Sequence, residues 1–187
     1  MPRCLTAASF AAPALVLLTI ACGNTGLPTG VNVNVVDTVS LYALDGTALD
    51  LPSGFRIATP NVVRTDLESD FDFAFNITPA GQAVLLPTGA LHLGIGSGIQ
   101  VQTASFDAIT VTPGGAYIDS LPVNVDSGTV AVVHSRATSC PLTASFGYLY
   151  AKLEVLKIDT VARRIDLKVL TNQNCGYHSL TPGNPTK

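Results

Sequence analysis

Charged residues are scarce in this sequence of 187 amino acids, of which only 12% are Asp, Glu, Lys or Arg. Ten basic residues stand against thirteen acidic ones, which gives a formal net charge of −3 at pH 7. A protein that binds DNA or RNA needs a dense basic surface to neutralise phosphates. The composition therefore excludes nucleic acid as a partner.

Motifs of catalysis are also missing. The sequence contains no Gly-x-Ser-x-Gly nucleophile motif and no Cys-x-x-Cys redox motif. Its three histidines, His92, His134 and His178, do not stand at the spacing of a zinc site. No cofactor is indicated, and we expect a protein that is not an enzyme. Because all-β folds host enzymes that lack a recognisable motif, an unrecognised hydrolase stays an alternative.

The first 21 residues have the anatomy of an export leader. Arg3 is the only charged residue among the first thirty, and an apolar run follows it over residues 5–22. The run ends with Leu18-Thr19-Ile20-Ala21-Cys22-Gly23. This segment resembles the lipobox of bacterial lipoproteins, in which a peptidase cuts before a cysteine that carries a diacylglycerol. The resemblance implies a lipid on Cys22 and a membrane-anchored protein of the bacterial cell envelope, with its domain on the periplasmic side.

Two other interpretations of residues 1–21 stay open. An ordinary signal peptidase that cuts after Ala21 would release the protein without a lipid. Alternatively the leader is retained as a membrane anchor. The eighteen residues of the run would span about 27 Å as a helix, close to the ~30 Å hydrocarbon core of a bilayer. Arg3 would then hold the amino end in the cytoplasm.

A short tether and one domain follow the leader. Residues 22–30 are rich in Gly, Pro, Thr and Asn, a composition typical of a flexible linker. Residues 31–187 suit one domain with a hydrophobic core, and a second domain is not expected. Cys140 and Cys175 are the only cysteines in this part, so in an oxidising compartment we expect a disulfide bond between them.

Alternating apolar and polar residues predict an all-β fold. Apolar residues occupy the odd positions from Val31 to Ala43, except Asp37, and predict a half-buried strand. Turn residues recur every eight to twelve positions without helical periodicity, which is typical of a single antiparallel β-sandwich or a barrel-like domain. The clearest strand covers residues 70–77, with Phe71, Phe73, Phe75 and Ile77 on one face. Shorter strands are expected at 83–86, 108–112, 116–118, 121–125 and 128–134.

The last element is predicted to be a long hairpin, formed by residues 146–158 and 164–171. Its apolar face jumps by one residue near Leu156, which predicts a β-bulge there. Basic residues are concentrated in this part of the chain and indicate a surface for an acidic partner or anionic lipid headgroups. With two tyrosines, this candidate partner surface consists of Tyr148, Tyr150, Lys152, Lys157, Arg163, Arg164 and Lys168. A sugar site lined by Tyr148, Tyr150 and Tyr177 is a further hypothesis, against ordinary cross-strand packing.

Carboxylates recur at every second position before the phenylalanine-rich strand. On an extended chain this spacing places Asp66, Glu68, Asp70 and Asp72 on one face. Clustered oxygen ligands are what Ca²⁺ requires, so a calcium site is one hypothesis. The other is a charged strand edge that deters pairing with a second protein.

These observations favour a membrane-anchored envelope domain that acts as a non-enzymatic interaction or structural subunit, for example as an accessory subunit of a larger membrane complex. The expected partners are the membrane and an envelope protein. The alternative is a lipoprotein that binds a small ligand such as a sugar, a lipid or calcium.

Overall fold

The computed structural model describes residues 30–94, 96–140 and 145–185. One sheet consists of β1 (Val36–Tyr42), β12 (Arg164–Asn172), β11 (Tyr150–Asp159), β8 (Val130–His134) and β6 (Gly98–Gln102), in that order. The other consists of β3 (Asn61–Val63), β2 (Gly54–Arg56), β4 (Phe73–Ile77), β5 (Ala83–Pro87) and β7 (Val123–Asn124). A separate hairpin consists of β9 (Thr138–Cys140) and β10 (Ser145–Gly147), and two short 3-10 helices are η1 (Thr88–Leu91) and η2 (Phe106–Ala108).

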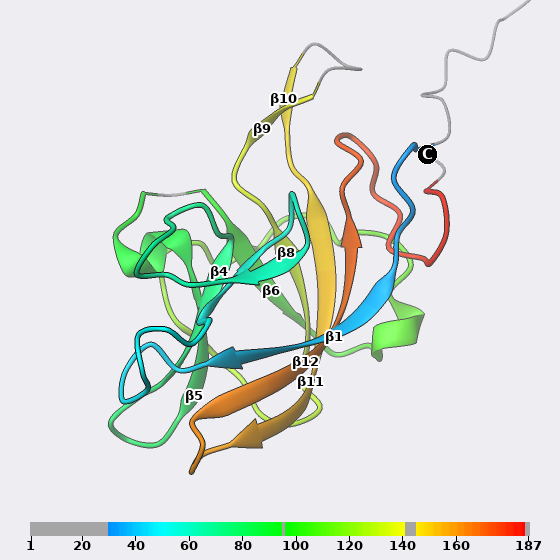
Figure 1. The fold of residues 1–187 in the computed structure, drawn as a ribbon. Helices are drawn as coiled ribbons and strands as arrows, with labels where there is room; N and C mark the ends of the chain where they lie inside the picture. The colour runs from blue at the N-terminus through cyan, green and yellow to red at the C-terminus, as the bar shows by residue number, and fades with distance from the viewer. Residues whose placement is uncertain (1–29, 95, 141–144, 186–187) are drawn as a thin grey trace, which may run out of the picture.

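The strand pairs are antiparallel, and the two five-stranded sheets pack together as a β-sandwich (Figure 1). Both sheets contribute to one buried core, in which Phe73 and Phe75 of β4 meet Leu153 of β11 and Leu167 of β12. Burial of such large apolar side chains is the main force that holds the two sheets together. The predicted fold class is therefore confirmed. Phe71 departs from the prediction, since it lies in a smaller cluster outside this core.

β11 and β12 form the predicted long hairpin. Their register shifts between Val155 and Lys157, so the predicted bulge at Leu156 is confirmed. The first arm begins at Tyr150 rather than at residue 146, because residues 145–147 pair with β9 instead.

The segment before β1 is not the strand that its alternation predicts. Asn34 is buried, whereas the flanking apolar side chains are exposed. The backbone of Asn34 pairs with that of Gly183, and its side-chain amide donates to the carbonyl oxygens of Ser179 and Thr181 at 3.2 and 3.0 Å. These hydrogen bonds direct the Asn34 side chain toward the carboxyl-terminal segment, so the apolar side chains on either side of it face the solvent. The exposed residues are Val31, Val33 and Val35.

The strands expected at 108–112 and 116–118 do not form either. Each segment contributes one isolated bridge, between Val111 and Ser179 and between Ile118 and Ile99. Together with η2, this part of the chain covers the outer face of the first sheet, where Phe106 lies in a second hydrophobic cluster.

Candidate functional site

One end of the sandwich is built from segments that contain no Asp, Glu, Lys or Arg, and we call it the uncharged end. A backbone hydrogen bond joins the first and the last described residues at this end: the N–H of Gly30 donates to the carbonyl of Pro185 at 2.9 Å. The β9–β10 hairpin extends from the same end (Figure 1) and is bonded covalently to the segment after β12. The uncharged end consists of residues 30–35, 137–140, 145–149 and 173–185.

The covalent bond is the predicted disulfide between Cys140 and Cys175, whose Cα atoms are 5.4 Å apart. It closes the open end of the β11–β12 hairpin, as the sequence predicts. Gly147 on β10 lies directly against the bond, and a Cβ atom at this position would be 2.7 Å from the Cys140 Sγ. Only glycine fits there without a shift of the disulfide or of the hairpin.

Asparagine side chains hold the amino-terminal segment to this end. The side chain of Asn174 accepts from the N–H of Asn32 at 2.9 Å and donates to the Asn32 carbonyl at 2.8 Å. Asn172 accepts from the N–H of Asn174 at 2.9 Å and donates to the carbonyl of Ser179 at 2.9 Å. Asn172 and Asn174 are buried, so their polar groups are satisfied inside the protein. The point at which the chain enters the domain is thereby fixed.

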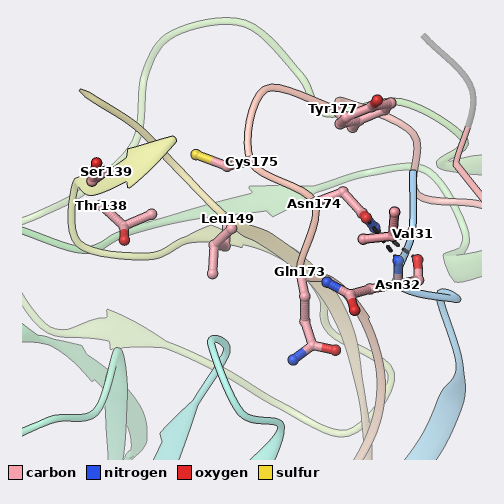
Figure 2. A pocket seen from close by; sticks show the side chains of 9 residues that line it. All are labelled: Val31, Asn32, Thr138, Ser139, Leu149, Gln173, Asn174, Cys175 and Tyr177. Atoms are coloured by element: carbon pink, nitrogen blue, oxygen red, sulfur yellow. Dashed lines mark hydrogen bonds between the residues drawn. The ribbon is translucent and has the colours of Figure 1, made fainter. Parts of the chain in front are cut away.

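A pocket of about 390 Å³ opens between these segments (Figure 2). Its lining contains no carboxylate, ammonium, guanidinium or imidazole group, so it offers no side chain for general acid–base chemistry near neutral pH. Such a pocket suits an apolar group. The lining residues are Val31, Asn32, Thr138, Ser139, Leu149, Gln173, Asn174, Cys175 and Tyr177.

Large apolar side chains around this pocket are exposed to solvent. Val31, which lines the pocket, is 84% exposed, and Phe146 on β10 is 80% exposed. Val33, Val35 and Tyr148 are also exposed. Exposed apolar residues that gather in one region, instead of being scattered singly, mark interaction sites.

A group of charged residues that includes Arg56 and Arg136 lies beside the uncharged end. The turn between β11 and β12, at the far end of that hairpin (bottom of Figure 1), is also charged. Arg163 in this turn donates to the carbonyl oxygens of Asp45 and Ile77, each at 2.7 Å. Arg164 pairs with Asp166 at 3.1 Å. The two bonds of Arg163 hold the turn against β4 and the loop after β1, whereas the Arg164–Asp166 pair lies within β12.

The predicted partner surface is not one surface, because Lys152 is buried. Its ammonium group donates to the carbonyls of Phe106 and Ile109 at 2.8 and 2.9 Å, and burial lowers the pKa of Lys152. The side chain points to the outer face of the sheet, as alternation requires, but η2 covers that face. Lys168 lies nearby, and its ammonium group is 3.6 Å from the carboxylate of Asp107 and 3.9 Å from that of Glu154.

The three tyrosines of the sugar hypothesis do not line one site. Tyr177 is buried, whereas Tyr148 and Tyr150 lie together at another pocket.

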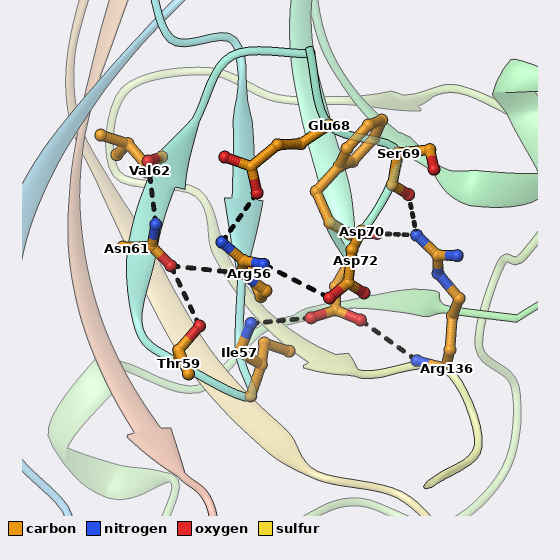
Figure 3. Close-up of polar contacts among 11 residues, drawn as sticks. Arg56, Ile57, Thr59, Asn61, Val62, Glu68, Ser69, Asp70, Asp72 and Arg136 are labelled. Atoms are coloured by element: carbon orange, nitrogen blue, oxygen red, sulfur yellow. Dashed lines mark hydrogen bonds and ion pairs between the residues drawn. The ribbon is translucent and has the colours of Figure 1, made fainter.

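The four carboxylates of the calcium hypothesis do not share a face, because the chain turns at residues 65–67. Asp66 pairs with Arg64 at 2.7 Å, and this hydrogen bond lowers the pKa of Asp66. Glu68 and Asp70 both pair with Arg56, at 2.9 and 3.3 Å (Figure 3). Within the part of the chain that the structure describes, no group of three or more His, Cys, Asp or Glu is arranged to hold a metal ion.

Asp72 is buried, and its carboxylate accepts hydrogen bonds from the backbone N–H groups of Ile57 at 2.7 Å and Arg136 at 3.1 Å (Figure 3). The guanidinium of Arg136 donates to the carbonyls of Ser69 and Phe71. Burial raises the pKa of Asp72, and the two backbone donors act against this effect. The expectation that Asp72 faces solvent with the other three acids is therefore wrong: it joins β2 to the segment after β8.

The uncharged end was not predicted, although part of it is visible in the sequence. No charged residue occurs between Arg136 and Lys152, or between Lys168 and Lys187. If these two uncharged segments pack against each other, they form an uncharged surface. The tertiary structure shows that they do so, and that residues 30–35 join them.

No protein-family model matches this chain, and no curated protein matches it. Cys22, the expected lipid attachment site, lies outside the described residues. Between residues 30 and 185, as far as the structure describes them, no helix is both long and apolar enough to cross a membrane.

Proposed function

We propose that this protein is a membrane-anchored, non-enzymatic module of the bacterial cell envelope, and that its uncharged end binds a protein partner in the membrane. One observation carries the proposal: the segment that would link the domain to a lipid on Cys22 enters the domain at residue 30, within the uncharged end. The surface poorest in charge is thus the one held closest to the anchor.

The tether limits how far the entry point of the domain can lie from the anchor. Gly30 is eight positions after Cys22, and an extended chain advances by at most ~3.3–3.6 Å per residue, so the two are within about 29 Å of each other. Because Gly30 is bonded to Pro185 at 2.9 Å, this limit applies to the point at which the chain enters the uncharged end. The charged turn between β11 and β12 would then face away from the bilayer.

The composition of the uncharged end also suits an interface with a membrane protein. The centres of protein interfaces are depleted in charged residues and enriched in aromatic ones. Phe146 and Tyr148 are exposed on the chain that leads to Leu149, which lines the pocket. The pocket itself can receive an apolar side chain of the partner, as binding hot spots commonly do.

Charged substitutions in the uncharged end are expected to abolish the interaction. Val31→Asp and Phe146→Asp each place a carboxylate in the centre of the proposed interface, where desolvation without a partner is costly. We expect at least a tenfold lower yield of the partner when either variant is extracted from native membranes in gentle detergent, a loss of roughly 1.4 kcal/mol or more. Co-purification, with the partner quantified by mass spectrometry, is the measurement.

Val161→Asp is the matched control, because Val161 is 95% exposed in the turn between β11 and β12. It should retain the partner, and all three variants should unfold at the temperature of the wild type. A monodisperse wild-type monomer in the same extracts would contradict the proposal. Retention of the partner by both variants of the uncharged end would also contradict it.

A further inference from the structure

A second pocket lies on the outer face of the first sheet, and aromatic side chains dominate it. Its volume of about 320 Å³ is at the lower end of the range for small-molecule sites. Three of the five tyrosines and two of the three histidines in the sequence line it. We propose that this pocket binds a neutral saccharide. The five side chains are Tyr117, His134, Tyr148, Tyr150 and His178.

The pairing of β8 with β11 brings these rings together. His134 and Tyr150 stand directly opposite each other in the register, so their side chains share the outer face of the sheet, and Tyr148 precedes Tyr150 by two residues. The rings of His134 and Tyr148 have centroids 4.5 Å apart, and Tyr117 meets His134 edge-on at 4.7 Å. Tyr150 and His178 are 5.3 Å apart. The five rings therefore form two contacting groups that line one pocket.

The position of His134 depends on Gly98, its partner on β6. A Cβ atom at residue 98 would lie 2.5 Å from the Nε2 of His134 and 2.9 Å from the Cβ of Tyr117. The Nδ1 of His134 is 2.8 Å from the carbonyl oxygen of Ser135, so Nδ1 carries the proton that this hydrogen bond needs. The ring is thus held in place before a ligand arrives, which reduces the entropy lost on binding.

The loop of residues 112–116 contributes the rest of the lining and is fixed at both ends. The Oγ1 of Thr112 is 2.7 Å from the Nδ1 of His178, and the backbone N–H of Thr112 donates to the His178 carbonyl at 2.9 Å. The Tyr117 hydroxyl donates to a carbonyl of the loop at 3.3 Å. Gly114 and Gly115 have open space where a side chain would stand, so the pocket remains accessible.

The chemistry of the lining selects a neutral ligand that has both apolar faces and hydroxyl groups. No Asp, Glu, Lys or Arg lines the pocket, which disfavours phosphates, nucleotides and free amino acids. The face of an aromatic ring is electron-rich, so the weakly positive C–H groups on one side of a pyranose ring pack well against it. The hydroxyls of Tyr148 and Tyr150 make no hydrogen bond to the described residues and are available to sugar hydroxyls.

Tyrosine fluorescence provides the test, because the sequence contains no tryptophan. The full-length protein in detergent is titrated with glucose, galactose, mannose and N-acetylglucosamine up to about 50 mM, which covers millimolar dissociation constants. At least one sugar is expected to change the fluorescence saturably and to raise the Tm. Tyr148→Ala should weaken this binding about tenfold or more. Phe146→Ala, two residues away and outside the pocket, should bind within about twofold of the wild type.

The absence of a saturable change with all four sugars would overturn the proposal, as would unchanged affinity in Tyr148→Ala. Binding of glucuronate as tight as that of glucose would contradict the selection of neutral ligands. The titration uses the purified protein without a partner, so its result does not depend on the proposed partner surface, although Tyr148 and His178 belong both to this pocket and to the uncharged end.

Discussion

Replacing both Cys140 and Cys175 with serine is expected to lower the free energy of unfolding by about 4 kcal/mol. The disulfide joins residues that are 35 positions apart, so its removal restores many conformations to the unfolded chain. In the folded protein the bond ties the β9–β10 hairpin to the segment after β12. Equilibrium unfolding in denaturant, followed by circular dichroism, measures the difference between the double variant and the oxidised wild type.

Reduction supplies the control for this prediction. The wild type in reductant should approach the stability of the double variant, and the double variant itself should not respond to reductant. A difference below about 1 kcal/mol between the oxidised and the reduced wild type would show that the bond constrains little.

Replacing Asp72 with alanine is expected to lower the free energy of unfolding by about 3 kcal/mol. Alanine would leave two backbone N–H groups, those of Ile57 and Arg136, without the carboxylate that accepts from both. Each donor that loses its partner inside the protein costs roughly 1–3 kcal/mol. Asn at this position keeps one acceptor oxygen, so the loss in Asp72→Asn should be about half as large. Denaturant unfolding at pH 7 measures all three proteins.

Asp70 provides the matched control, two residues away on the same segment. It is exposed, and its contact with Arg56 is a surface ion pair at 3.3 Å. Asp70→Ala should change the stability by less than about 0.5 kcal/mol. If Asp72→Ala were no more destabilising than Asp70→Ala, the structural role assigned to the buried carboxylate would be wrong.

The parts of the fold that the sequence predicts are those in which residues close together in the sequence determine the local structure. Alternation identifies β4 and the β11–β12 hairpin because side chains on a strand point to opposite faces. The jump in the apolar face near Leu156 identifies the bulge for the same reason. The disulfide was predictable because, once the leader is set aside, the sequence holds no other cysteine pair.

The errors arose where a distant segment overrides the local pattern. Val31, Val33 and Val35 alternate as a strand would, but Asn34 finds its hydrogen-bond partners in the carboxyl-terminal segment and turns inward. Lys152 stands at an outward position, as its spacing predicts, but η2 covers that position and provides two carbonyl acceptors. The sequence around Asn34 does not indicate its distant hydrogen-bond partners, and the sequence around Lys152 does not indicate that η2 covers it.

The candidate sites illustrate the same limit. Acidic residues at every second position suggested a shared face, but the arginines at 56 and 64 are near them in space and pair with three of the four. The uncharged end and the aromatic pocket each bring together residues more than 60 positions apart in the sequence, such as Val31 and Tyr177 in the first and Thr112 and His178 in the second. Composition can show that such residues exist, and only the tertiary structure shows that they meet.

The central claim is that a lipid on Cys22 holds the uncharged end at the membrane. Mass spectrometry of the amino-terminal peptide, obtained by proteolysis of the protein from its native membranes, tests this claim most directly. We expect a peptide that begins at Cys22 and carries a lipid on that cysteine. A peptide that begins at Cys22 without lipid, or one that still contains Met1, would contradict the lipid anchor on Cys22.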